Sequence, residues 1–165
     1  MESLEAVTLL SQASGAQQLR RIGTFDLDCS ADIAFPLFSP EGERLWIKTW
    51  NPRPIFPDSI VFQPETVFRQ GEGKEEAVWT IVDVDWRTHR AEYVRVAPAS
   101  HAAHVVVALE ARSQKHCRVN VSYSLTAFGE DAASLLDSFS ESPFAEKMRT
   151  WRRWISEYLM VEGAP

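Results

Sequence analysis

Between residues 102 and 128, apolar and polar side chains alternate in two runs, 102–112 and 117–128. Alternation of this kind is typical of strands that bury one face. The opposite parity is polar, with Glu110, Asn120 and Ser122 among its members. We therefore predict two neighbouring strands whose inward face consists of Val105, Val107, Leu109, Val119, Val121, Tyr123 and Leu125.

Similar runs upstream predict further strands at 18–29, 65–70, 76–85 and 90–97, separated by polar or glycine-containing turns. The run 18–29 alternates clearly, whereas 76–85 and 90–97 have apolar residues on both parities. Parity alone therefore leaves open which face of those two strands is buried.

Two serines predict two short helices after the first strand. Ser30 and Ser39 suit the N-cap position, Pro40 suits the first helical position, and Glu41 and Glu43 suit the positive end of a helix. The following segment, 51–64, contains prolines at 52, 54, 57 and 64. We predict it to be an ordered loop.

A long helical stretch is predicted at 131–159, with a kink or a second helix start at Pro143. Its apolar stripe contains Leu135, Leu136, Phe139, Phe144, Met148, Trp151, Ile155, Tyr158 and Leu159. We expect the opposite, solvated face to carry Glu146, Lys147, Arg149, Arg152, Arg153 and Glu157.

The chain divides into an N-terminal tail or short helix at 1–16 and one domain at 17–160. Leu4, Val7 and Leu10 have helical spacing, but Ser14 and Gly15 end that stretch. A chain of 165 residues suits a single domain with one core.

Composition excludes several classes of function. A net charge of −6 and a pI near 5.2 disfavour nucleic acid as a partner. No apolar run reaches the roughly 18 residues of a membrane span, and the acidic N-terminus does not suit a secretory signal. Cys29 and Cys117 are too few for a disulfide scaffold or a zinc ribbon. We expect a soluble, cytoplasmic protein without integral membrane association.

The order of one strand, two short helices, a meander of strands and a long C-terminal helix resembles a known superfamily. The most specific similarities lie at 35–46, at Trp50, at 78–81 and at 123–127. They resemble bacterial members of the START-like, or SRPBCC, superfamily. This group includes polyketide cyclases, lipid-transfer domains, plant pathogenesis-related allergens and co-chaperones that activate Hsp90.

The resemblance implies an α+β helix-grip fold, in which a curved antiparallel sheet of six to seven strands surrounds the C-terminal helix. It implies a cavity between sheet and helix, and it requires no metal or organic cofactor. It supplies no universal catalytic residue. It also implies that the first and last strands are neighbours, in a register that would pair Cys29 with Cys117 and Leu27 with Val119. We expect two buried thiols there rather than a working redox pair.

Aromatic and apolar side chains are the candidates for lining such a cavity, because rings offer contact area with few rotatable bonds. Plain core packing is the alternative for each of them. The candidate ligand-binding residues are Trp46, Trp50, Phe56, Trp79, Tyr93, Arg95, Val107, Tyr123, Phe144, Met148 and Trp151.

Polar candidates inside the cavity are few. Tyr123 faces inward by parity, and Tyr93, Arg95 and Asp83 would do so if their strands turn that way. Arg95 beside Tyr93 could hold a ligand carboxylate or enolate oxygen, and the alternative is a surface arginine paired with a carboxylate. His101 and His104 are three apart on a strand and face opposite sides, which disfavours a metal site.

Three functions fit these features. The first is binding of a small hydrophobic or aromatic ligand, such as a lipid, a polyketide or a related metabolite. The second is an enzyme resembling a polyketide cyclase or dehydratase, in which Tyr93, Arg95 or Tyr123 steers an enolate. The third is an interaction module like the co-chaperones, supported by the two-sided apolar strand at 76–85, which would also suit a homodimer.

Overall fold

The central feature of the fold is a curved antiparallel sheet of eight strands, in the order β1-β2-β8-β7-β6-β5-β4-β3. The structure is a computed structural model that describes residues 10–11 and 15–162. The strands are β1 (Leu10–Ser11), β2 (Gln17–Leu27), β3 (Arg53–Phe56), β4 (Val67–Gln70), β5 (Ala77–Asp85), β6 (Arg90–Ala97), β7 (His101–Ser113) and β8 (His116–Ala127).

Short helical segments and one long helix complete the chain. They are α1 (Ala31–Ala34), η1 (Phe35–Phe38), α2 (Pro40–Glu43), η2 (Gly73–Glu75), α3 (Ala132–Ser138) and α4 (Glu141–Val161). The predicted caps are confirmed. Ser30 Oγ accepts from the Ile33 N–H at 3.2 Å, and Ser39 Oγ accepts from the Gly42 N–H at 2.9 Å.

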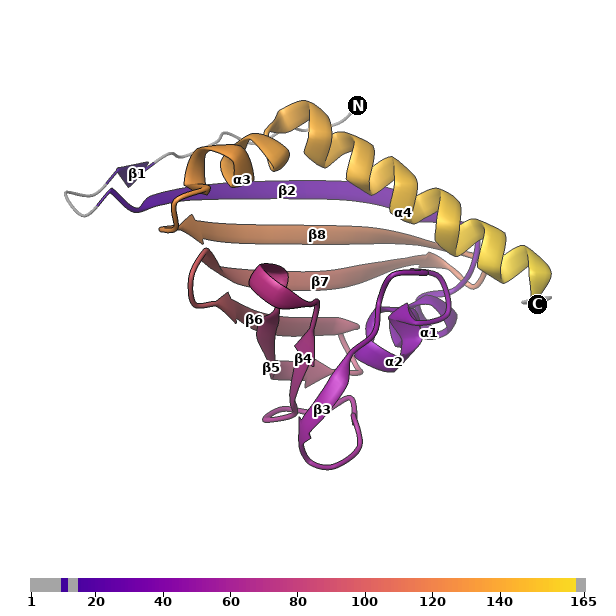
Figure 1. The fold of residues 1–165 in the computed structure, drawn as a ribbon. Helices are drawn as coiled ribbons and strands as arrows, with labels where there is room; N and C mark the ends of the chain where they lie inside the picture. The colour runs from indigo at the N-terminus through magenta and orange to yellow at the C-terminus, as the bar shows by residue number, and fades with distance from the viewer. Residues whose placement is uncertain (1–9, 12–14, 163–165) are drawn as a thin grey trace.

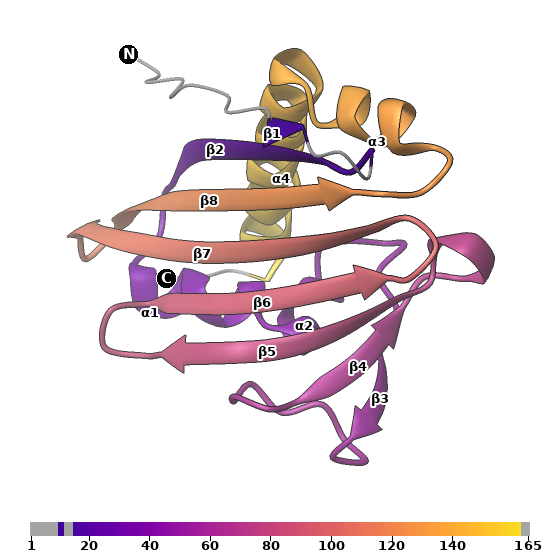
Figure 2. The same cartoon turned by 90° about the vertical axis from the view of Figure 1, so that its left-hand side faces the viewer.

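One face of the sheet carries all of the packing helices (Figure 1). Seen from the other face, α1, α2 and α4 all lie behind the strands (Figure 2). The long helix crosses β2 closely at Gly23, where an added Cβ would lie 2.5 Å from Met148 Cγ. The predicted α+β helix-grip fold is therefore confirmed.

The core lies between this face and the helices. All of the predicted inward residues of β7 and β8 are buried, with Val119, Val121 and Leu125 at 0% exposure. The structure also orients the two ambiguous strands, because Trp79, Ile81 and Tyr93 are buried. Residues of β5 and β6 that face the other side of the sheet are exposed, among them Val78, Val82 and Val96.

The predicted register of the first and last strands is wrong by two residues. Leu27 pairs with Cys117 and Phe25 with Val119, because β2 ends at Leu27 and Cys29 lies beyond it. A register shift of two residues leaves every side chain on the same face of the sheet. Both cysteines are accordingly buried and free.

The segment 51–64 is not wholly a loop, since it contains β3. This strand is at the end of the sheet order, next to β4. An edge strand tolerates Pro54, because its outer side forms no ladder hydrogen bonds. The prolines favoured the prediction of a loop, and the sequence pattern therefore did not predict β3.

The ends of the chain also depart from expectation in part. In the segment predicted as a tail or a short helix, 1–16, Leu10 and Ser11 form β1 rather than helix, and residues 1–9 and 12–14 lie outside the described residues. The stretch 131–159 is two helices, and Pro143 lies in the first turn of α4. None of the described helices is long and apolar enough to cross a membrane.

Candidate functional site

A small cavity lies in the interior between the sheet, α2 and α4. Its volume is about 20 Å³, and it is lined by Pro40, Glu43, Trp50, Phe68, Trp79, Tyr93, Val105, Val107, Tyr123 and Trp151. A space of this size holds about one water molecule. A lipid or polyketide would therefore enter only if side chains that line the cavity moved.

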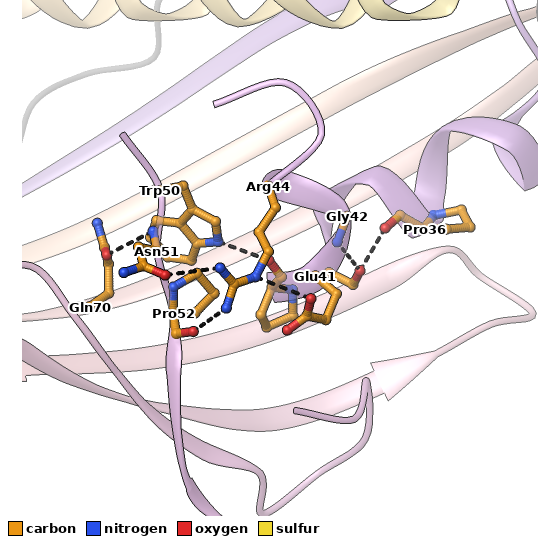
Figure 3. Close-up of polar contacts among 10 residues, drawn as sticks. Pro36, Glu41, Gly42, Arg44, Trp50, Asn51, Pro52 and Gln70 are labelled. Carbon is orange, nitrogen blue, oxygen red and sulfur yellow. Dashed lines mark hydrogen bonds and ion pairs between the residues drawn. The ribbon is translucent and has the colours of Figure 1, made fainter. Parts of the chain in front are cut away.

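The segment after α2 positions Trp50 against this cavity (Figure 3). The Trp50 indole N–H donates to the Pro40 carbonyl at 2.8 Å. Arg44 donates to Asn51 Oδ1 at 3.0 Å and to the Pro52 carbonyl, and it forms an ion pair with Glu41 at 3.1 Å. These contacts hold residues 44–52 in a closed turn.

Aromatic rings fill most of the interior in edge-to-face and stacked pairs. Trp79 lies 5.5 Å from Trp50 and 5.8 Å from Phe68, measured between ring centroids. The Tyr93 hydroxyl donates to the Phe38 carbonyl at 2.7 Å. Trp151 contacts Trp46 at 5.6 Å. The rings thus form a nearly closed aromatic lining around the small cavity.

Glu43 brings a carboxyl group to the same cavity. Burial raises the pKa of Glu43 well above its ordinary value of 4.5. Burial also raises the pKa of both Tyr93 and Tyr123; at Tyr123 the Arg95 charge opposes this increase, and at both residues Glu43 adds to it only when ionised. The cavity therefore favours a neutral carboxyl beside two neutral phenols, a set of groups that can donate protons.

Two cations lie at the end of the interior nearest α3. The Arg95 guanidinium carbon is 5.3 Å from the Trp79 ring and 5.7 Å from the Tyr123 ring. Lys147 Nζ is 5.7 Å from the Tyr123 ring and 4.6 Å from the Phe139 ring. Burial, and then the Arg95 charge, lower the pKa of Lys147 to about 8.

His101 begins β7 and belongs to the inward parity of that strand. Burial, and secondly the Arg95 charge, lower the pKa of His101 to about 4. Its ring is therefore neutral at pH 7. Its Nδ1 lies 2.9 Å from Ser100 Oγ, and its Nε2 is buried without a hydrogen-bond partner in the described residues.

A second and larger space is an open cleft of about 300 Å³ between β2 and α4. It is lined by Arg21 to Asp26, Arg118, Glu141, Phe144, Ala145, Met148, Arg149 and Arg152. Several of its charged side chains already form ion pairs: Arg118 with Asp26 at 2.9 Å, and Arg149 with Glu146 at 2.6 Å. The Arg21 guanidinium donates to the Phe139 carbonyl at 2.8 Å.

The structure distributes the predicted ligand-binding residues over several places. Phe144 and Met148 line the open cleft, Trp46 is buried beside Phe38, and Arg95 lies on the rings of Trp79 and Tyr123. Phe56 does not line the interior, because it is 71% exposed on the edge strand β3. Those that border the small cavity are Trp50, Trp79, Tyr93, Val107, Tyr123 and Trp151.

Sequence reasoning missed Glu43, Lys147 and His101 as interior groups. Glu43 was assigned to the charged start of a helix, but α2 is a single turn and its last residue borders the cavity. Lys147 was placed on the solvated face, which is wrong: it precedes the buried Met148, and its amine lies over two rings. The inward parity of β7 would have identified His101.

No protein-family profile matches the chain, and none of the curated proteins matches it. Solved structures do. Norcoclaurine synthase from Thalictrum flavum, solved in complex with dopamine and hydroxybenzaldehyde, is 12% identical over 100% of this chain and 98% of its own, with a TM-score of 0.65.

Two further structures give the same result. The Zhui aromatase/cyclase from Streptomyces sp. R1128 is 12% identical over 87% of this chain and 96% of its own, with a TM-score of 0.64. The major latex-like protein 151 from Panax ginseng is 11% identical over 86% and 97%, with a TM-score of 0.63. At such identities the likeness concerns the fold. The chain therefore has the same helix-grip fold as these proteins, as the order of its elements predicts.

Proposed function

We propose that this protein binds a small hydrophobic or aromatic ligand in the interior beneath α4. The observation that carries the proposal is the small cavity itself, where aromatic rings surround inward polar groups. The Tyr123 hydroxyl and the Glu43 carboxyl form no hydrogen bond there with any other described residue. Such a lining offers apolar contact area together with a few groups that orient a ligand.

The solved structures support a ligand of this kind. Norcoclaurine synthase, which has the same fold, was solved with dopamine and hydroxybenzaldehyde, both small aromatic molecules. Burying about 300 Å² of apolar ligand surface would contribute roughly 7 kcal/mol before the costs of association. Part of that free energy must move side chains, because the cavity holds only about 20 Å³.

The side chains best placed to move are Trp50 and Trp151, since both border the cavity and are only half-buried. Displacing a ring that already contacts solvent costs less than displacing a fully buried one. We infer that the ligand enters between α2 and α4. An aromatic ligand would then replace the ring contacts that the tryptophans give up.

Binding can be tested with the neutral fluorescent probe N-phenyl-1-naphthylamine. We expect enhanced, saturable fluorescence in the micromolar range and a raised melting temperature. The variant Phe56→Ala is the control, because Phe56 is exposed and any binding through it would be superficial. A protein that shows no saturable binding, and from which mass spectrometry recovers no copurified apolar compound, would contradict the proposal.

A second candidate is an enzyme related to polyketide cyclases or dehydratases. The specific observation in its favour is the raised pKa of Glu43 beside Tyr93 and Tyr123. A neutral carboxyl can protonate a substrate oxygen, and a phenol can stabilise the same oxygen by donating a hydrogen bond to it. Once a substrate is found, unchanged turnover in both Glu43→Gln and Tyr123→Phe would contradict catalysis by these groups.

A third candidate is a protein-interaction surface on the outer side of the sheet. The co-chaperone-like module and the homodimer now depend on Val78, Val82 and Val96, which form the exposed outer side of β5 and β6. Trp79 and Ile81, which suggested this surface, are buried on the inner side. A cytoplasmic location and a lipid or polyketide as the ligand stay predictions.

A further inference from the structure

Arg95 reaches the interior because of its position in the sheet. It lies opposite Trp79 across the β5–β6 ladder and shares its parity with the buried Tyr93. Its Nε is buried and has no hydrogen-bond partner among the described residues. A buried donor without a partner is costly unless something else satisfies it.

Lys147 approaches the same place from the opposite side of the interior. It projects from α4, and its amine lies over the rings of Phe139 and Tyr123. The Tyr123 ring is therefore shared, since Arg95 also lies 5.7 Å from it. Tyr123 in turn borders the small cavity. The two cations thus lie beside the space that the proposed function assigns to the ligand.

Neither cation has an anionic partner among residues 15–162, where no carboxylate lies at ion-pair distance from Arg95 or Lys147. Other arginines of the sheet do have one, such as Arg118 with Asp26 and Arg53 with Glu76. Contact with aromatic faces stabilises a cation but does not neutralise its charge. Two positive charges near one ring repel each other, and an anion between them would remove that cost.

We propose that Arg95 and Lys147 together bind the carboxylate of the ligand, so that the ligand is a small aromatic or hydrophobic carboxylic acid. This inference rests on the proposed function and narrows it. With the carboxylate between the two cations, the apolar part of the ligand lies against Tyr123 and extends toward Trp79 and Tyr93. Charge-assisted hydrogen bonds to a carboxylate are among the strongest that a protein forms.

Several groups determine how this site responds to pH. Arg95 on β6 and Tyr123 on β8 face Lys147, His101 on β7 is near Arg95, and Glu43 on α2 lies beyond Tyr123. Arg21 on β2 lies close to the same end through its bond to the Phe139 carbonyl. Of these, Lys147 is the one with a pKa of about 8. Binding of a carboxylate raises that pKa, so the complex takes up a proton.

The test compares 2-naphthoate with 2-naphthamide, which match in shape and differ in charge, by isothermal titration calorimetry at pH 7. We expect 2-naphthoate to bind at least about tenfold more tightly. Lys147→Met and Arg95→Met should each reduce the affinity for naphthoate toward that for naphthamide. Lys115→Met, which removes an exposed lysine from the β7–β8 turn, is the matched control and should leave both affinities unchanged.

A second measurement uses the native protein first, so its main result does not depend on the folding of a variant. At pH 8, titrations in buffers with different heats of ionisation should show uptake of about half a proton with naphthoate and none with naphthamide. Uptake should disappear in Lys147→Met.

The outcomes separate the two proposals. Equal affinity for the two compounds would overturn the carboxylate site and leave the proposed function standing. A preference for naphthoate that survives both substitutions would overturn the assignment to Arg95 and Lys147. Binding of neither compound would contradict the proposed function and, with it, this inference.

Discussion

Glu41 and Glu43 lie two residues apart on the single turn of α2, yet their surroundings differ. Glu41 is exposed and pairs with Arg44, whereas Glu43 borders the interior cavity. Burial raises the pKa of Glu43 well above 4.5. The folded protein therefore retains a proton on Glu43 at pH values where the unfolded chain has lost it. Stability that is fully present below pH 4.5 is lost as the pH rises toward the folded-state pKa.

Replacing this carboxyl with an amide should remove that loss. We expect Glu43→Gln to match the native protein in its free energy of unfolding near pH 4 and to exceed it at pH 7. Urea unfolding at both pH values measures the difference. Glu157→Gln, on the exposed side of α4, is the control and should show no such dependence on pH. If the two proteins differed in free energy of unfolding by the same amount at pH 4 and pH 7, burial would not raise the pKa of Glu43.

At the scale of elements, the segment that joins α2 to β3 is held by a few polar contacts. Arg44 binds the Asn51 side chain and the Pro52 carbonyl, and the Asn51 N–H donates to Gln70 Oε1 on β4 at 3.2 Å (Figure 3). Since Trp50 lies within this segment, these contacts fix one side of the cavity. The serine caps and Pro40 predicted the helices here, but side-chain contacts across 44–70 carried no periodic pattern in the sequence.

Arg44→Ala should therefore loosen the Trp50 segment without unfolding the protein. We expect a loss of about 1 kcal/mol in stability and faster hydrogen exchange at the backbone amides of Trp50, Asn51 and Arg53. Arg87→Ala provides the control, because the Arg87 side chain is 94% exposed. Unchanged exchange at these amides in Arg44→Ala would mean that backbone packing alone holds the segment.

At the scale of the whole molecule, the interior is almost filled. A packed interior stabilises the fold but leaves about 20 Å³ for a ligand. Stability and binding should therefore oppose each other at the residues that line the cavity, as they do wherever function requires space inside a core. Trp50 is the most informative of these residues, because it is half-buried and contacts both Trp79 and Phe68.

Trp50→Ala should lower the stability of the protein and raise its affinity for the ligand. We expect the free energy of unfolding to fall by about 2 to 4 kcal/mol, while the affinity for N-phenyl-1-naphthylamine increases severalfold because the enlarged cavity needs no rearrangement. Denaturant unfolding and fluorescence titration measure these changes. Reduced stability with unchanged affinity would locate the ligand away from the interior.

The sequence by itself determined most of the elements and the burial of many of their faces. Strand-like runs identified β2 and β4 to β8, the serine caps located α1 and α2, and the apolar stripe identified α3 and α4, because these patterns are local. The order of the elements was sufficient to suggest the helix-grip fold. The face of β5 that is buried could not be decided, since both of its parities are apolar.

Only the tertiary structure decided which polar groups share the interior. Arg95 and Lys147 are 52 residues apart in the sequence, and they come together because side chains from β6 and from α4 both reach the ring of Tyr123. The edge position of β3 and the volume of the cavity depend in the same way on contacts between distant segments. Such contacts result from how the sheet curves and how rings fill the space beneath it. A local pattern of apolar and polar residues cannot predict them.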